Sequence, residues 1–170
     1  MSLRHALVSA CLGAAVVATL HPALSLRAEQ AAAVDEQAPL LGTWRMNLAK
    51  SRYMPGPPPV SETRTFSRDR TGVVGTVQRR LLDGRSETIQ YRADYAREYP
   101  VSGTEAYDAV IFRRIDRYTA EAVLSHAGRV YGTALRVVAR DGRTMTITFR
   151  GEQSNGVDVH NIVLYDKVAQ

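Results

Sequence analysis

The chain has 170 residues and a formal net charge of +5, from 22 Lys and Arg against 17 Asp and Glu, and 45% of its residues are hydrophobic. That length predicts one domain of ordinary size, and a single cysteine excludes a scaffold stapled by internal disulfides. The positive charge is scattered along the chain without a zinc-finger, helix-turn-helix or RNP signature, so we expect no nucleic-acid partner.

The first 25 residues have the layout of a secretory signal peptide. Arg4 supplies a positive start, residues 6–20 form an uncharged apolar run, and Ala23-Leu24-Ser25 gives a small-x-small cleavage pattern. Because the run is shorter than the ~20 residues of a spanning helix, we expect cleavage after Ser25 and no stable membrane span afterwards. A retained anchor is the alternative. Cys11 lies in the signal, so the exported chain would lack cysteine and reside in the periplasm or outside the cell.

Residues 26–39 are rich in Ala, Glu and Gln and predict a flexible leader, with a short helix as the alternative. From residue 40, segments rich in Val, Ile, Thr, Tyr and Phe alternate with turn signals, which is the pattern of an all-β sandwich or barrel. Asp83-Gly84 and Asp141-Gly142 favour hairpin turns. A short edge strand is expected within 96–106, and the other predicted strands are 42–49, 61–68, 73–82, 86–95, 107–115, 118–126, 129–139, 143–151 and 157–168.

Consecutive hairpins predict an antiparallel up-and-down meander of about eight to ten strands, which closes into a barrel because closure removes both edges. Residues 40–170 therefore form one all-β domain in this prediction, after the signal helix. Alternation places Met145, Ile147 and Phe149 on the dry face of their strand. Gly132 is expected to mark a bulge or bend. Because the last strand is apolar on both sides, we expect the proline-rich residues 40–59 to cover its outer face or cross the barrel base.

The stretch LGTWRMNLAKSRY, residues 41–53, resembles the opening of lipocalin-like and related calycin proteins, whose first strand carries Gly-x-Trp. Gly42 and Trp44 fit that pattern. The resemblance implies that Trp44 plugs the closed base of the barrel and that a cation from a late strand, Lys167 or Arg150, packs over its ring. From about residue 40 to 168, the chain is also similar to exported bacterial lipocalin-like proteins without an assigned activity.

Tyrosines of the middle strands have arginines nearby, and such side chains inside a barrel suit a ligand with an apolar body and an acidic or hydroxyl group. The alternative is that these tyrosines face outward as good strand formers. His160 is either a partly exposed neighbour of Asp158 or a polar group of the interior. The candidate ligand-binding residues are Tyr91, Phe112, Tyr118, Tyr131, Arg136 and His160.

Metal and nucleophile chemistry find little support in the sequence. His126 and His160, the histidines that follow the signal, lack ligand spacing, and no nucleophile motif is present, so we expect no metal and no cofactor. The carboxylates that acid–base chemistry would use are Glu62, Asp94, Asp108 and Glu121, provided that the fold brings them together.

Three functions remain open. The sequence favours a monomeric protein that binds a small apolar or amphipathic molecule in a barrel cavity. The second is a cofactor-independent isomerase, hydratase or cyclase that uses the same cavity through an inward histidine or carboxylate. The third is a structural or interaction module of the cell envelope with a filled core.

Overall fold

The computed structural model describes residues 37–152 and 155–169. The predicted signal, residues 1–25, lies outside the described residues, as does the leader up to residue 36. Gln37 is buried, and its Nε2 donates a hydrogen bond to the Ala93 carbonyl at 3.0 Å, so the chain packs on the domain from this residue onward. Within the described part of the chain, no helix has the length and hydropathy needed to cross a membrane.

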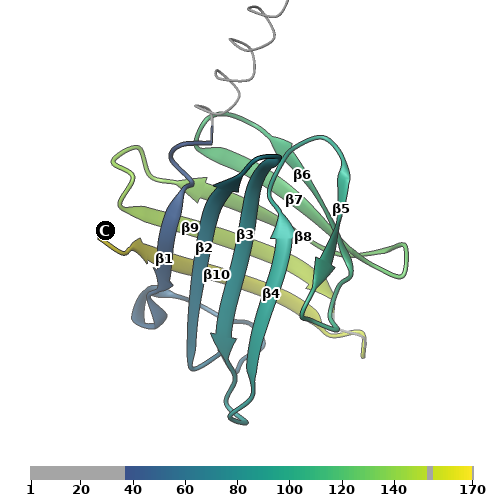
Figure 1. Ribbon diagram of the computed structural model, residues 1–170. Helices are drawn as coiled ribbons and strands as arrows, with labels where there is room; N and C mark the ends of the chain where they lie inside the picture. Colours follow the sequence, from purple (N-terminus) through teal and green to yellow (C-terminus); the bar gives the residue numbers. More distant parts are fainter. Residues whose placement is uncertain (1–36, 153–154, 170) are drawn as a thin grey trace, which may run out of the picture.

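Ten antiparallel strands make up the described domain, and they follow one another as a meander (Figure 1). Because β1 pairs with β10 as well as with β2, the sheet closes into a barrel, which confirms the predicted fold class and is compatible with a lipocalin-like fold. The strands are β1 (Gly42–Met46), β2 (Ser61–Asp69), β3 (Gly72–Arg80), β4 (Ser86–Arg92), β5 (Glu98–Ser102), β6 (Ala109–Arg114), β7 (Thr119–His126), β8 (Arg129–Val138), β9 (Thr144–Glu152) and β10 (Asp158–Lys167).

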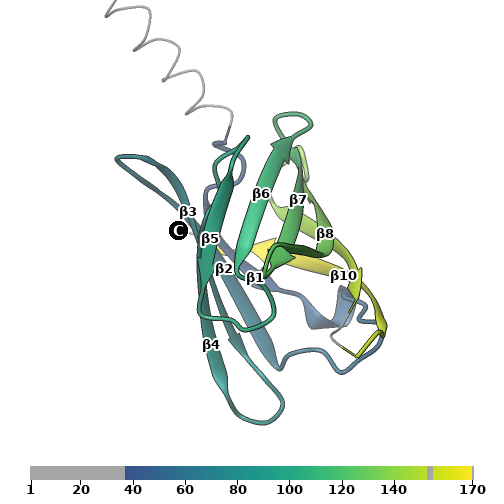
Figure 2. The ribbon, with the colours of Figure 1, turned by 90° about the vertical axis from the view of Figure 1, so that its right-hand side faces the viewer.

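Alternate side chains of each strand point into the barrel. Met145 and Ile147 of β9 are buried, and Phe149 packs against the same core, as the sequence pattern predicted. Figure 2 shows the wall of β2–β5 facing the wall that contains β6, β7 and β8. Between these walls lie the core and the cavities described below.

Trp44 lies at the end of the barrel where β1 begins, and its side chain is fully buried. Its Nε1 donates to the Leu40 carbonyl at 2.8 Å, and Lys167 Nζ lies 4.8 Å from the Trp44 ring centroid. Gly42 has φ +116°, and a Cβ at this position would lie 3.0 Å from Lys167 Cε. The positive φ favours glycine at this position, and the approach of Lys167 to the indole leaves little room for a side chain there. Arg150 is exposed on β9.

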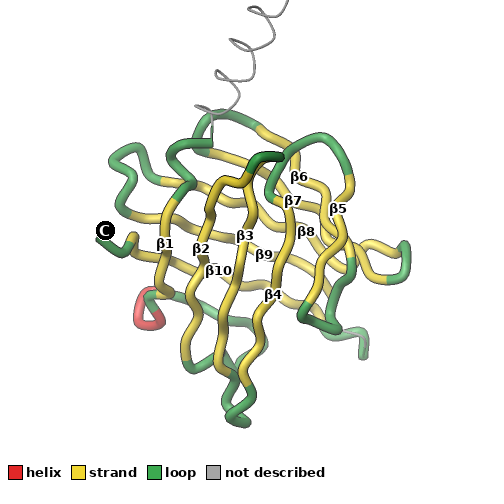
Figure 3. The backbone as a smooth tube through the Cα atoms, viewed as in Figure 1, coloured by secondary structure: helices red, strands yellow, loops and turns green. Residues whose placement is uncertain are grey.

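The segment after β1 follows a different path from the predicted one. The strand ends at Met46, and the short 3-10 helix η1 (Leu48–Lys50), drawn in red in Figure 3, follows it. Arg52 then pairs with Ile162, and the His160 N–H donates to the Met54 carbonyl at 2.7 Å. The chain thus continues along the edge of β10, in the plane of the sheet, and does not cover the outer face of that strand.

The prolines at 55–59 lie at the end of the barrel opposite Trp44. They line a cavity there together with Arg79 and Leu81, which stand at the end of β3. The expectation that this segment crosses the base is therefore wrong. The physical reason is the antiparallel path: β1 runs away from the base, so the connection to β2 must turn at the other end.

The predicted edge strand within 96–106 is β5, which is paired on both sides in the closed barrel. Gln90 and Tyr91 pair with it from β4, and Ala109, Val110 and Ile111 pair with it from β6. Pro100 lies within β5 and has no N–H to donate, which limits the length of these ladders.

Candidate functional site

The open end of the barrel holds a cavity of about 590 Å³, termed the outer cavity here. Its walls come from β2, β3, β4, β7, β8, β9 and β10, and the prolines at 55–59 form part of its rim. Small-molecule sites have volumes of roughly 300–1,000 Å³. The barrel is therefore not filled by its own side chains at this end.

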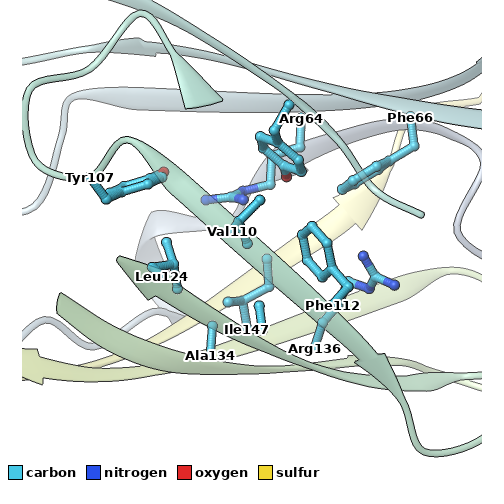
Figure 4. A pocket seen from close by; sticks show the side chains of 11 residues that line it. Arg64, Phe66, Tyr107, Val110, Phe112, Leu124, Ala134, Arg136 and Ile147 are labelled. Atoms are coloured by element: carbon cyan, nitrogen blue, oxygen red, sulfur yellow. The ribbon is translucent and has the colours of Figure 1, made fainter. Parts of the chain in front are cut away.

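A second cavity of about 60 Å³, the inner cavity, lies nearer the base, where Phe66 pairs with Gly42 (Figure 4). Figure 4 shows Arg64 on one side of this space and Arg136 beside Phe112 on the other. The two cavities adjoin, because five residues line both of them: Arg64, Tyr107, Leu124, Ala134 and Ile147. The interior is thus a wide mouth that narrows to a small chamber.

Glu62, Arg64 and Tyr165 form a polar cluster on the wall of the outer cavity. Arg64 Nε lies 2.7 Å from Glu62 Oε1, and the Tyr165 hydroxyl donates to the same carboxylate oxygen at 2.5 Å. Burial acts to lower the pKa of Arg64, but the attraction of Glu62 and Tyr165 outweighs it and holds that pKa well above its usual value. With Glu62 only 4% exposed, the cluster is an internally compensated buried ion pair.

Tyr107, Tyr131 and Phe149 form an aromatic wall at the mouth. The Tyr107 and Tyr131 ring centroids lie 5.8 Å apart, and those of Tyr131 and Phe149 lie 5.6 Å apart. All three residues line the outer cavity. Successive rings at these separations offer flat apolar surface to a bound molecule.

A β-bulge brings Tyr131 to this wall. Leu124 of β7 pairs with Gly132, but Ser125 pairs with Val130, so Tyr131 is an extra residue in β8. The predicted irregularity at Gly132 is thus confirmed. A Cβ on Gly132 would lie 2.6 Å from Phe149 Cζ, so glycine is needed here for the close approach of the Phe149 ring.

The buried tyrosine hydroxyls remain protonated at neutral pH. Burial raises the pKa of Tyr107 to about 12, and burial also raises the pKa values of Tyr131 and Tyr165 above their usual range. The Tyr165 hydroxyl therefore donates to Glu62, the Tyr107 and Tyr131 hydroxyls are O–H donors on the cavity wall, and none of the three acts as a base.

Four of the six candidate ligand-binding residues line the cavities. Tyr91, Phe112 and Arg136 line the inner cavity, with the Tyr91 and Phe112 ring centroids 5.7 Å apart, and Tyr131 lines the outer one. Tyr118 lines neither cavity and packs against the hydrophobic core.

His160 also lines neither cavity. Its neighbours Val159 and Asn161 both line the outer cavity, so strand alternation places the His160 side chain on the outside of the barrel. Its Nε2 is buried and has no hydrogen-bond partner among the residues that the structure describes. The interior position considered for His160 is therefore wrong.

The four carboxylates considered for acid–base chemistry do not converge. Asp94 bonds to Arg92 Nε at 2.9 Å and accepts from the Val73 N–H, so it supports a turn. Of the four, only Glu62 lines a cavity. In residues 37–152 and 155–169, no group of three or more His, Cys, Asp or Glu side chains is arranged to hold a metal ion.

Sequence reasoning missed the roles of Arg64, Tyr107 and Tyr165. A signal was available in the second strand, because Glu62 and Arg64 share the parity of Phe66, which is buried. Two opposite charges at positions i and i+2 on an apolar face indicate an ion pair inside the barrel. The contact of Tyr165 with this pair joins β10 to β2 and had no local signal.

No protein-family model and no curated protein matches this chain.

Proposed function

We propose that this protein binds a small amphipathic molecule inside its barrel. The observation that carries the proposal is the pair of adjoining cavities, about 590 and 60 Å³, lined by aromatic rings and by a few polar groups. A ligand site of this kind supplies apolar contact area for affinity and a small number of polar contacts for orientation. Closed β-barrels of this size have room for one small ligand.

The proposal includes export, with action in the periplasm or outside the cell, as a monomer and without a cofactor. Its support is the sequence of residues 1–25, which has the charged start, apolar run and small-residue cleavage pattern of a secretory signal. We also propose that this protein is related to exported bacterial lipocalin-like proteins. The Gly42-x-Trp44 pattern and the barrel topology support this relationship.

Binding is favoured over the two alternatives. Three carboxylates line the outer cavity, and each is already bonded: Glu62 accepts from Arg64 and Tyr165, Glu87 from Arg79, and Asp83 from Arg85. A carboxylate engaged in this way is poorly placed to take a proton from a substrate. A packed structural module would have a filled interior, which the 590 Å³ cavity contradicts.

Filling the interior is expected to abolish binding. Ala134 lines both cavities, so Ala134→Trp places a large ring where the ligand body would lie. Titration with N-phenyl-1-naphthylamine, a neutral fluorophore that brightens in apolar surroundings, is expected to show saturable binding to the unsubstituted protein. We expect the affinity of the Ala134→Trp variant to fall at least about ten-fold.

Thr133→Trp is the matched control, because Thr133 is the preceding residue on β8 and is exposed on the outer face. This variant adds the same ring and should bind the fluorophore as the unsubstituted protein does. Circular dichroism checks that both variants retain the β-fold. Absence of saturable binding to the unsubstituted protein, or equal loss in both variants, would contradict the proposal.

A further inference from the structure

Three arginines line the cavities, and two of them are already paired with carboxylates. Arg64 bonds to Glu62 at 2.7 Å, and Arg79 bonds to Glu87 at 2.7 Å near the mouth. The third is Arg136 of β8, which lines the inner cavity. Within residues 37–152 and 155–169, no carboxylate forms an ion pair with Arg136.

Arg136 is nevertheless buried, with only 7% of its surface exposed. Its guanidinium lies between two aromatic rings, 5.6 Å from the centroid of Phe66 and 5.6 Å from that of Phe112. Ring faces stabilise the positive charge but accept no hydrogen bonds along the edge of the guanidinium. A guanidinium has five N–H donors, and among the described residues its one hydrogen bond is a long one of 3.5 Å from Nη2 to the Tyr95 hydroxyl.

The charge of Arg136 is therefore incompletely compensated in the free protein. Burial lowers the pKa of Arg136, and the nearby Arg64 lowers it further, but an arginine remains charged at neutral pH. A buried charge without a counter-charge is costly, and an anion that reaches it removes that cost. The inner cavity provides about 60 Å³ beside this group, which is room for only a few heavy atoms.

We propose that the ligand is an organic anion, an apolar body that bears one carboxylate or an equivalent acidic group, and that its head binds Arg136 in the inner cavity. This inference rests on the proposed function and names the chemistry of its ligand. The body then extends past Ala134 into the outer cavity and along the aromatic wall. The orientation follows from the charges, because Arg79 at the mouth already bonds to Glu87 and leaves Arg136 as the interior cation for the head.

A pair of ligands that differ only in the head group tests the inference. Decanoate and decan-1-ol have the same chain, and each is titrated at pH 8 as a competitor of bound N-phenyl-1-naphthylamine. We expect the unsubstituted protein to bind decanoate about ten- to a hundred-fold more tightly than decan-1-ol, the range of buried charge-assisted hydrogen bonds. Arg136→Met is expected to remove this preference, so that the variant binds decanoate no more tightly than it binds decan-1-ol.

Arg45→Met is the matched control, since Arg45 is exposed on β1 and its replacement changes the net charge equally. This variant should keep the full preference for decanoate. Arg136→Lys keeps the charge but loses the planar fork, so we expect it to retain part of the preference. If Arg136→Met does not fold, two measurements still test the inference. They are the preference of the Arg136→Lys variant and the ratio of the affinities of the unsubstituted protein for decanoate and decan-1-ol.

Equal affinities for decanoate and decan-1-ol would overturn the inference, as would a preference that survives in Arg136→Met. Neither result would contradict the proposed function, provided that N-phenyl-1-naphthylamine binds to the unsubstituted protein and that the Ala134→Trp variant loses this binding. Failure of the neutral fluorophore to bind would instead overturn the proposed function itself.

Discussion

Replacing Arg64 with Met is expected to lower the free energy of unfolding by about 3 kcal/mol. The substitution keeps most of the side-chain volume but leaves the Glu62 carboxylate, which is 4% exposed, with the Tyr165 hydroxyl as its remaining bonded partner. Removal of one member of a buried ion pair typically costs about 3–5 kcal/mol. We expect the lower end of that range because the pair borders the outer cavity and the Arg64 side chain is 19% exposed. Denaturant unfolding followed by circular dichroism measures the loss.

Two further variants show whether the cause is the unpaired carboxylate. The double variant Glu62→Gln with Arg64→Met is expected to be more stable than Arg64→Met alone, because it no longer buries a charge. Arg136→Met removes an interior guanidinium that has no carboxylate partner in the described residues, so we expect no loss of stability or a gain. Equal losses in Arg64→Met and Arg136→Met would contradict this account of the interior charges.

Replacing Trp44 with Ala is expected to cost about 4 kcal/mol of unfolding free energy. The indole is fully buried at the base, its N–H bonds to the Leu40 carbonyl, and its ring supports Lys167. Trp44 is also the only tryptophan in the chain, so unfolding must be followed by circular dichroism and not by tryptophan fluorescence. Trp44→Phe keeps part of the packing and provides a milder variant if Trp44→Ala does not fold.

The Lys167 ammonium above the Trp44 ring is expected to contribute separately to the free energy of unfolding. Lys167→Met should cost about 0.5–2 kcal/mol in the presence of Trp44, since the ammonium lies 4.8 Å from the ring centroid. In the Trp44→Phe background, the same substitution should cost less, because phenyl is a weaker cation partner than indole. Equal costs in the two backgrounds would show that Lys167 stabilises the barrel without help from the Trp44 ring.

The sequence by itself determined the fold class and most of the strands. Alternating apolar residues and regular turn signals predicted a meander, and the absence of amphipathic helices left closure of the sheet as the way to remove its edges. Trp44 was correctly expected to be buried, and the irregularity at Gly132 was expected from a glycine within a strand. These properties depend on local pattern, which is why they can be seen without the structure.

The path of the segment between β1 and β2 depended on the tertiary structure. The prolines at 55–59 excluded a helix but did not specify which end of the barrel they would reach. The Arg52 N–H donates to the Ile162 carbonyl, and the His160 N–H donates to the Met54 carbonyl. These bonds hold the segment along β10, so the prolines that follow it lie at the mouth of the barrel. Such contacts join residues more than a hundred positions apart, and no local pattern encodes them.

Which side chains face the barrel interior also depended on the tertiary structure. Tyr131 and Arg136 have opposite parity along β8, so alternation alone would place them on opposite faces, and only the bulge beside Gly132 lets both face the cavities. Sequence determined which residues could carry charge and aromatic surface. The pairing of Arg64 with Glu62 follows from alternation along one strand. The tertiary structure decided that Tyr165 joins this pair and that, among the described residues, Arg136 meets two aromatic rings and no carboxylate, because these contacts depend on which strands closure brings face to face.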